Sequence, residues 1–553
     1  MQNFNPPKQQ DVLNQLERLN TIGVALSAEH DHKRLLEVIL LGAKELTNAD
    51  GGTLYTVTDD GHLKFEILRN LSLDIAMGGT TGKAIPLPPL PIYDGNGQPN
   101  LTMVAVYSVA NAKTVNIPDA YLTEGFDFSG TAKFDAKMGY RSQSFLTVPM
   151  MNHENEIIGV LQLINAIDPV TKKIIPFSDS HQRLVESLAS QAAVALTNQN
   201  LISGLKNLFE SFIKLIADAI DEKSPYTGGH CQRVPELTMM LAEAAINTDS
   251  GPFRNFTMTE KEVYELKIAA WLHDCGKVTT PESVMDKATK LETTFDRIHL
   301  IDQRFELLKT QRENAHLRKA MEEVIGGKPI NVKYLEHGVN VIKKQLDDDK
   351  NFIRKINFGS EFMKPEDQQR VRDIANYEYM SDSGHSLKFL SENEIYNLTI
   401  ARGTLTPEER TVINNHIVVT VNMLEALPYP KDLRRVPEYA GGHHERMDGK
   451  GYPKGLKREQ MSIPARMMGI ADIFEALTSK DRPYKRAKNL SETLRILGNM
   501  KLDNHIDPDI FDLFISEKIY LRYAEKFLEA EQIDEVIEAN IPGYLVNISI
   551  AAT

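Results

Sequence analysis

Five short segments of the sequence carry histidine and aspartate in patterns that could bind metal ions. They are HCQRV at 230–234, HDCGK at 273–277, LTPEERTVINNH at 405–416, HHERMDGKGYP at 443–453 and ADIFEAL at 471–477. Neutral imidazole and carboxylate are suitable ligands for divalent iron, manganese, zinc or nickel. Because five of the 15 histidines fall in these segments, we expect them to meet at one metal centre.

An aspartate beside a histidine suits a centre with two metals, because each carboxylate oxygen can bind one ion. Two neighbouring cations can polarise a phosphodiester, lower the pKa of a bridging water and stabilise the leaving oxygen. Each segment alone is a weak signal, since a single histidine on an apolar helix is more often a packed core residue. All five segments in order, with two adjacent pairs of candidate ligands, indicate a functional site.

Together these motifs resemble the HD-GYP family, a subgroup of the HD-domain phosphohydrolases. The match covers roughly 226–285 and 401–520. That family opens cyclic di-GMP at a centre of two or three metals. The resemblance implies divalent metal ions, with iron or manganese favoured and zinc or nickel as alternatives. It also implies catalytic roles for Asp274 and Lys277, with Asp274 as the bridge. The metal ligands that it implies are His230, His273, Asp274, His416, His443, His444 and Asp472.

Several side chains near these ligands could contact substrate. Lys277 lies four residues after the first histidine of HDCGK, so on a helix both share one face. Its ammonium could bind a phosphate oxygen or protonate the leaving alkoxide. Gly449 and Gly451 allow a tight turn close to a ligand. Tyr452 offers a ring for base stacking or a hydroxyl for a phosphate, and Arg482 a donor fork for phosphate or guanine. We expect Lys277, Gly451, Tyr452 and Arg482 to bind substrate; the alternative for the two cations is a surface ion pair.

Two features depart from the family pattern. Three-metal members have a glutamate four residues before the first ligand histidine, where this chain has Tyr226, a poor ligand while protonated. This substitution favours two metals. The family also places its third histidine soon after the HD pair, whereas the segment 286–400 intervenes here. His299 lies nearer the family distance, but LTPEERTVINNH matches the motif better, so His416 is the predicted ligand.

The rest of the chain must position these residues, and its 553 residues are too many for one ordinary core. We expect a multidomain protein with an N-terminal leader (1–20) and an α/β sensor domain (21–180). A linking coiled-coil-type helix (181–223) follows. An all-α catalytic domain (224–545) completes the chain, with a helical insertion at 286–400.

The sensor domain should contain short strands separated by turns rich in Gly, Asp and Asn. The stretch AIPLPPLPIYDGNG has four prolines and should be a loop. The expected strands are the β-rich runs at 53–57, 63–68, 102–109, 144–150 and 157–166.

Residues 139–197 resemble a GAF domain, especially the GAF domains of cyclic-nucleotide phosphodiesterases. Asn165, Phe177 and Asp179 match a spaced motif of those domains, while Ala166 replaces its lysine. The resemblance implies a small-molecule ligand such as a cyclic nucleotide. The alternative is a module that serves only for dimerisation.

The linking helix shows apolar residues at alternating spacings of three and four, which is typical of a coiled coil. It predicts a parallel homodimer, and the alternative is a helix packed on its own domain. Polar Gln191 and Asn198 interrupt the seam. Its apolar members are Leu184, Leu188, Ala195, Ile202, Leu205, Phe209, Phe212, Ile216 and Ala219.

The insertion has amphipathic portions around 291–324 and 333–356, and a third around 366–380. They predict a helical hairpin over or beside the site, with Arg297 and Arg304 as lid donors. A solvated appendage is the alternative.

Composition limits the partners. A net charge of −13 argues against binding of polymeric nucleic acid. No apolar run approaches the roughly 18 residues of a membrane helix, and the N-terminus lacks signal-peptide features. Two cysteines cannot form a disulfide framework, so we expect a cytoplasmic protein without membrane contact. Cys231 and Cys275 should pack in the core, and His505 should be structural.

The resemblance therefore implies a phosphodiesterase that hydrolyses cyclic di-GMP to pGpG and/or GMP under control of the GAF domain. One alternative is the same chemistry on cyclic GMP-AMP. Another is a non-catalytic receptor of cyclic dinucleotides or an interaction module. A nucleotide 5′-phosphohydrolase of the wider HD superfamily would leave DGKGYP unexplained.

Overall fold

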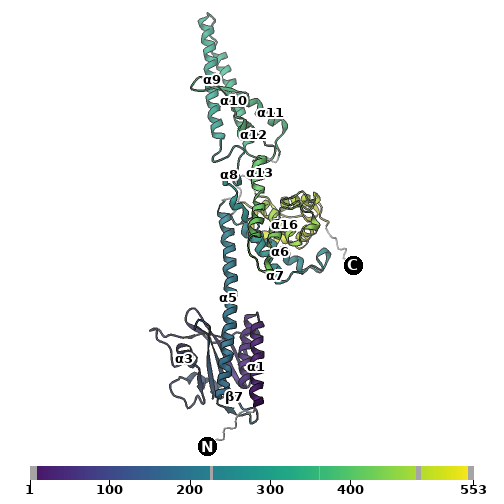
Figure 1. Cartoon of the computed structure of the whole chain (residues 1–553). Coiled ribbons are helices and arrows are strands. Elements are labelled where there is room, and N and C mark those ends of the chain that lie inside the picture. The colour runs from purple at the N-terminus through teal and green to yellow at the C-terminus, as the bar shows by residue number, and fades with distance from the viewer. Residues whose placement is uncertain (1–8, 224–227, 360–361, 481–486, 546–553) are drawn as a thin grey trace. The chain divides into compact units, whose positions relative to one another are not determined.

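The computed structural model describes residues 9–223, 228–359, 362–480 and 487–545 (Figure 1). The chain divides into two compact units, Met1–Leu208 and Phe209–Thr553. None of the described helices combines the length and apolarity that a membrane span requires.

The first unit is built on an antiparallel sheet with the order β3-β2-β1-β7-β6-β5. Helices α1 (Gln9–Ala28) and α2 (His32–Thr47) and the first half of α5 (Asp179–Lys223) share a hydrophobic core with this sheet. Helix α3 (Val104–Asn111) precedes β5, and helix α4 (Ser129–Met138) lies between β5 and β6. The strands are β1 (Ala49–Val57), β2 (His62–Asn70), β3 (Ile75–Gly78), β5 (Val115–Ile117), β6 (Phe145–Met151) and β7 (Ile157–Ile167), with β4 (Leu90–Pro91) beside β2 and β8 (Ile174–Ile175) beside β7.

Most predictions for this unit are confirmed. The runs at 53–57, 63–68, 144–150 and 157–166 lie in β1, β2, β6 and β7, and the proline-rich stretch is a loop apart from the short β4. The strand predicted at 102–109 is wrong, because Val104–Asn111 forms helix α3. Its Ala105 and Val106 pack in a second apolar cluster with side chains of β1, β2 and β7. A short apolar run has too little periodicity to separate a strand from a buried helix.

The expected linking helix is α5 (Asp179–Lys223), an unbroken helix of 45 residues. Its predicted seam is partly wrong, since Leu184 and Leu188 are buried in the core of the first unit. Near the other end, Ala217 and Ile220 pack in the core of the second unit. The exposed apolar stripe has alternating spacings of four and three, and each member is more than half exposed: Leu201, Leu205, Leu208, Phe212 and Leu215.

The second unit has a helical core that carries the histidine motifs. Asp274 separates α7 from the 3-10 helix η3 (Cys275–Thr279). The helices of this core region are α6 (His230–Asn247), α7 (Glu260–Leu272), α13 (Pro407–Asn414), α14 (His416–Glu425), α15 (Val436–Gly441), α16 (Ile463–Thr478), α17 (Leu490–Leu502), α18 (Pro508–Ser516) and α19 (Ile519–Phe527).

The insertion forms a helical hairpin as predicted, from α9 (Ile298–Ile325) and α10 (Val332–Asn357), with GGKP between them. Helices α11 (Pro365–Ala375) and α12 (Glu392–Leu398) and a small, unpredicted hairpin of β9 (Glu378–Met380) and β10 (Ser386–Lys388) follow. These elements share a hydrophobic core of their own, which runs from Leu291 to Leu398.

The two arginines predicted as lid donors make bonds within the insertion. Arg297 donates to Asn393 at 2.7 Å, and Arg304 pairs with Glu394 at 2.8 Å. Both side chains therefore stabilise the insertion.

Candidate metal centre

The second unit brings together all seven residues expected as metal ligands. Each lies at or beside a helix end, except Asp472, which lies within α16. His230 and His416 are the first residues of α6 and α14, and His273 caps the end of α7. The pair His443–His444 follows α15. Helix ends from distant parts of the chain thus converge on one point.

The seven side chains form two groups of metal-ligating atoms, and within each group these atoms lie within 4.8 Å of one another. One group is Asp274, His416, His443 and His444, and the other is His230, His273 and Asp472.

Asp274 faces both groups, one carboxylate oxygen toward each. Its Oδ2 lies 3.2 Å from Nε2 of His230 and 3.3 Å from Nε2 of His273. Its Oδ1 lies 3.2 Å from Nε2 of His416 and 4.0 Å from Nε2 of His443. This arrangement can bridge two cations.

Three of the imidazoles are oriented by the backbone. Nδ1 of His273, His416 and His443 lies 2.8, 2.6 and 2.6 Å from the carbonyl oxygen three residues earlier. A proton on Nδ1 donates to that oxygen and leaves the Nε2 lone pair directed at the centre. Nε2 of His443 is buried and has no hydrogen-bond partner among the described residues. A cation at this point would satisfy it, so the donor set fits a metal.

Glu475 bonds to His230 on the side of the ring away from the centre. The sequence motifs did not identify Glu475 as a functional residue. Its carboxylate accepts a hydrogen bond from Nδ1 of His230 and another from Nε of Arg233 at 2.7 Å. Burial lowers the pKa of His230, but Glu475 and the other nearby carboxylates outweigh burial and hold this pKa well above its ordinary value. Carboxylates commonly orient metal-binding histidines in this way. Glu475 lies three residues after Asp472 on the same helix, so both carboxylates lie on one helix face.

The charge states of Asp274, His443 and His444 favour metal binding. Burial would raise the pKa of Asp274, but Lys277 and His273 outweigh burial and hold it well below its ordinary value. Burial, together with neighbouring imidazoles, holds the pKa of His443 well below its ordinary value and that of His444 at about 4. An ionised carboxylate and neutral imidazoles are the forms that bind cations.

Lys277 lies at the centre, although not as the sequence suggested. The helix ends at Leu272, and Asp274 has φ −109° and ψ 11°, so the chain turns before η3 begins. Lys277 and His273 therefore do not share one helix face. The ammonium of Lys277 instead pairs with the carboxylate of Asp274. Burial lowers the pKa of Lys277, but Asp274 and Asp472 outweigh burial and raise it.

The DGKGYP loop packs against the group that contains His444. Gly449 has a φ of +79°, as the predicted tight turn requires. The ring of Tyr452 stacks on His444 with centroids 4.9 Å apart. A Cβ on Gly451 would lie 2.5 Å from Cα of Glu445, so this glycine permits close packing of the chain on itself. Arg482 and Tyr226 lie outside the described residues.

Other candidates lie outside the two groups. His299 is an exposed residue of α9. Cys231 and Cys275 are buried in the core of the second unit, as predicted. Burial lowers the pKa of His505, which lies in the turn before α18.

The GAF motif residues contribute to the fold of the first unit. The side chain of Asn165 donates to the carbonyl of Arg141 at 2.8 Å and accepts from the backbone N–H of Gln143 at 2.8 Å. Phe177 is buried in the core, and Asp179 begins α5.

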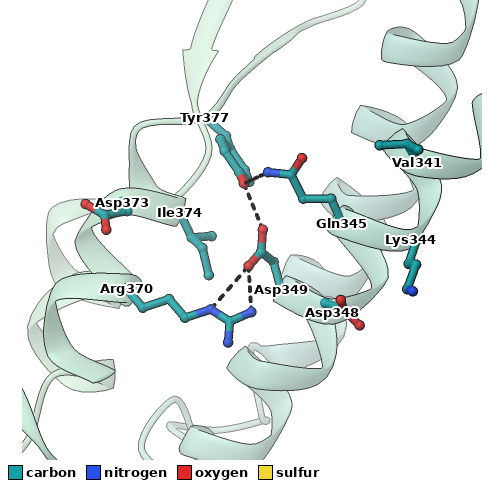
Figure 2. A pocket seen from close by; sticks show the side chains of 9 residues that line it. All are labelled: Val341, Lys344, Gln345, Asp348, Asp349, Arg370, Asp373, Ile374 and Tyr377. Atoms are coloured by element: carbon teal, nitrogen blue, oxygen red, sulfur yellow. Dashed lines mark hydrogen bonds and ion pairs between the residues drawn. The ribbon is translucent and has the colours of Figure 1, made fainter. Parts of the chain in front are cut away.

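A separate pocket of about 440 Å³ lies in the insertion, between α10 and α11. Figure 2 shows Asp349 at its centre, where it pairs with Arg370 at 2.9 Å and accepts from the hydroxyl of Tyr377 at 2.7 Å. Its lining residues lie between Val341 and Tyr377, so the pocket is distinct from the metal centre.

Comparisons with known proteins find matches in two separate parts of the chain. A GAF domain model matches residues 31–196, and an HD domain model matches residues 383–510. A probable cyclic di-GMP phosphodiesterase of Vibrio cholerae is 34% identical over 141 residues, which cover 24% of this chain and 32% of the relative.

Two further relatives match shorter stretches. A cyclic di-GMP phosphodiesterase of Pseudomonas aeruginosa is 42% identical over 97 residues, covering 17% of this chain and 23% of the relative. A 3′3′-cGAMP-specific phosphodiesterase of Vibrio cholerae is 41% identical over 80 residues, which cover 14% of this chain and 18% of the relative. The chain thus spans a third or less of the length of these relatives. The motifs and both domain models lead to one conclusion: the chain joins a GAF domain to an HD domain.

Proposed function

We propose that this chain is a metal-dependent cyclic dinucleotide phosphodiesterase that hydrolyses cyclic di-GMP to pGpG and/or GMP. The observation that carries the proposal is the position of Asp274, whose two carboxylate oxygens face two separate groups of histidines. The names of the relatives support the class of substrate.

We infer two divalent ions per chain, bound by His230, His273 and Asp472 on one side, by His416, His443 and His444 on the other, and bridged by Asp274. Imidazole and carboxylate donors favour iron or manganese, with zinc or nickel as alternatives. When bound, such ions would polarise the phosphodiester and stabilise the departing oxygen.

The chain's own residues would orient substrate and supply a proton. Lys277 lies beside the bridging carboxylate, so its ammonium is held at the centre. It can bind a phosphate oxygen and then donate a proton to the leaving alkoxide. The Tyr452 ring, held against His444, offers a surface for a nucleobase. Arg482 and Gly451 remain candidate substrate contacts.

A second candidate substrate is 3′3′-cyclic GMP-AMP, because one relative carries that specificity in its name. The test is a product assay with equal concentrations of both cyclic dinucleotides and saturating Mn²⁺. We expect faster opening of cyclic di-GMP, and loss of activity in Asp274→Ala with helical content retained. Preference for the mixed dinucleotide would reassign the substrate. Tight binding of either ligand without any product would instead indicate a non-catalytic receptor.

We further propose that the chain acts as a parallel homodimer under control of the GAF domain, whose ligand would be a small molecule such as a cyclic nucleotide. The exposed apolar stripe of α5 from Leu201 to Leu215 supports this proposal, because its spacing is that of a coiled coil. Insertion of one residue near Asn200 rotates the rest of the helix by about 100°, whereas insertion of four nearly restores the phase. We expect the first insertion to change basal hydrolysis more than the second. Equal activity in both variants and the parent would make α5 a passive connection.

A further inference from the structure

The last turn of α5 contacts two segments that carry candidate metal ligands. Asp221 and Lys223 belong to this turn, and both lie in the second unit. Asp221 bonds to the start of α6, which begins with His230, and Lys223 bonds to η3, which follows Asp274. The two side chains leave the helix about 200° apart, so they hold it from two sides.

Asp221 supplies a cap that α6 lacks. The residue before this helix is Gly229, at a φ of +81°, and it has no side chain to accept the first amides. Asp221 is 7% exposed, and its Oδ2 accepts the backbone N–H of Gly229 at 3.0 Å and of Cys231 at 3.2 Å. A carboxylate at a helix N-terminus satisfies free N–H groups and interacts favourably with the helix dipole. Because His230 lies between these two amides, the carboxylate fixes the backbone of the first ligand.

Lys223 binds the backbone of η3 and of the residue that follows it. Its Nζ donates to the carbonyl oxygens of Lys277 at 3.3 Å, Val278 at 2.5 Å and Thr280 at 2.7 Å. Carbonyl oxygens at the end of a helical turn can accept further hydrogen bonds, and a cation there is favourable. This contact fixes the turn that carries Lys277 and follows Asp274.

We propose that Asp221 and Lys223 are positioning residues, which set the separation of His230 and Asp274 by locking both segments to the end of α5. That separation is 3.2 Å between Nε2 and Oδ2, a distance that a shared cation would require. Since α5 is unbroken from Asp179 to Lys223, rotation of this helix would move the two ligand segments together. The inference rests on the metal centre of the proposed function, but not on its substrate.

The test uses the full chain with Asp221→Ala and Lys223→Met, beside the exposed neighbour Glu222→Gln as a matched control. Asp221→Asn and Lys223→Arg are conservative variants that can still accept or donate. Metal-free protein is titrated with Mn²⁺ by calorimetry, thermal unfolding is recorded with chelator, and hydrolysis is measured at saturating Mn²⁺.

We expect the dissociation constant for Mn²⁺ to rise roughly 10-fold in Asp221→Ala and in Lys223→Met, the size typical of residues that orient metal ligands. The conservative variants and Glu222→Gln should stay close to the parent, and saturating Mn²⁺ should restore much of the turnover. A lowered Tm with an unchanged Mn²⁺ dissociation constant would mean a merely structural role and would overturn the proposal. If Asp221→Ala does not fold, Lys223→Met decides the question alone.

The readouts separate this inference from the proposed function. A shifted Mn²⁺ affinity in a parent that hydrolyses no cyclic dinucleotide would support positioning and reject the phosphodiesterase. Normal hydrolysis with an unshifted Mn²⁺ affinity in both variants would support the phosphodiesterase and reject the positioning role. A parent that binds no Mn²⁺ and hydrolyses nothing would contradict both.

Discussion

Gly276→Ala should damage the metal centre although the substitution adds only one methyl group. Gly276 lies two residues after Asp274, where η3 packs against the start of α14, and its N–H donates to the hydroxyl of Thr420 at 2.9 Å. A Cβ at this position would lie 2.0 Å from the carbonyl oxygen of His416 and 2.6 Å from the backbone nitrogen of Thr420. Both obstacles are backbone atoms, so no side-chain rotation can relieve the overlap.

The displacement follows from these distances. Real Cβ atoms essentially never approach another atom below 3.0 Å, so the two segments must separate by about 3.0 − 2.0 = 1.0 Å. The 3.2 Å gap between Oδ1 of Asp274 and Nε2 of His416 would widen accordingly. Metal–ligand distances tolerate only about 0.2 Å. A misplacement of about 1 Å costs roughly 100-fold in rate.

The assay compares metal content and turnover of Gly276→Ala with those of Gly204→Ala. Gly204 lies in α5, and a methyl group there would have nothing within 4 Å, so this substitution should leave both quantities unchanged. We expect Gly276→Ala to lose metal from the group that contains His416 and to fall roughly 100-fold in turnover. If Gly276→Ala folds, retains full metal content and works within twofold of the parent, the proposed pairing of Asp274 with His416 is refuted.

Three further predictions concern other parts of the second unit. Glu475→Gln should weaken Mn²⁺ binding by roughly 10- to 100-fold in a calorimetric titration. An unchanged affinity would show that the Glu475 carboxylate does not orient His230 for metal binding. His416→Ala should lower metal content in elemental analysis while His299→Ala leaves it near normal; the opposite result would show that the ligand assignment across the insertion is wrong. Lys290 is buried with its Nζ on the carbonyl of Ile400 at 2.8 Å, and burial lowers its pKa to about 8. Its unfolded pKa is near 10.5, so the unfolded state holds more protons between these values and stability rises with pH across that range. Between pH 8 and 10 the parent should gain about 2 kcal/mol in free energy of unfolding relative to Lys290→Met, and parallel pH profiles would contradict this.

The chemistry of the site could be predicted from sequence because the ligands occur in short motifs. The choice of His416 over His299 depended on the better match of LTPEERTVINNH to the family motif, and this segment forms α13, which begins with Pro407 and has a capping box between Thr406 and Glu409. The structure places His416 among the other candidates and leaves His299 exposed on α9. A long insertion leaves a local capping motif unchanged, whereas it lengthens the spacing between the HD pair and the next ligand histidine.

The features that the sequence did not reveal depend on contacts between distant segments. Glu475 looks like any polar helix residue until its neighbour His230 is known, since 245 positions separate them. Gly276 owes its importance to α14, and the exposed stripe of α5 could be located only once Leu184 and Leu188 had been found in the core of the first unit. Apolar spacing gives the period of a helix, but several registers of α5 fit one period, and tertiary packing selects among them.

The most direct test of the bridged two-metal centre is the metal content of anaerobically purified protein, measured together with hydrolysis of cyclic di-GMP in the parent and in Asp274→Ala. The two-group arrangement predicts about two divalent ions per chain, and loss of both metal and activity when the bridging carboxylate is removed. A reproducible count near three would contradict the two-metal centre, and full activity in Asp274→Ala would contradict a reaction that depends on bridged metals.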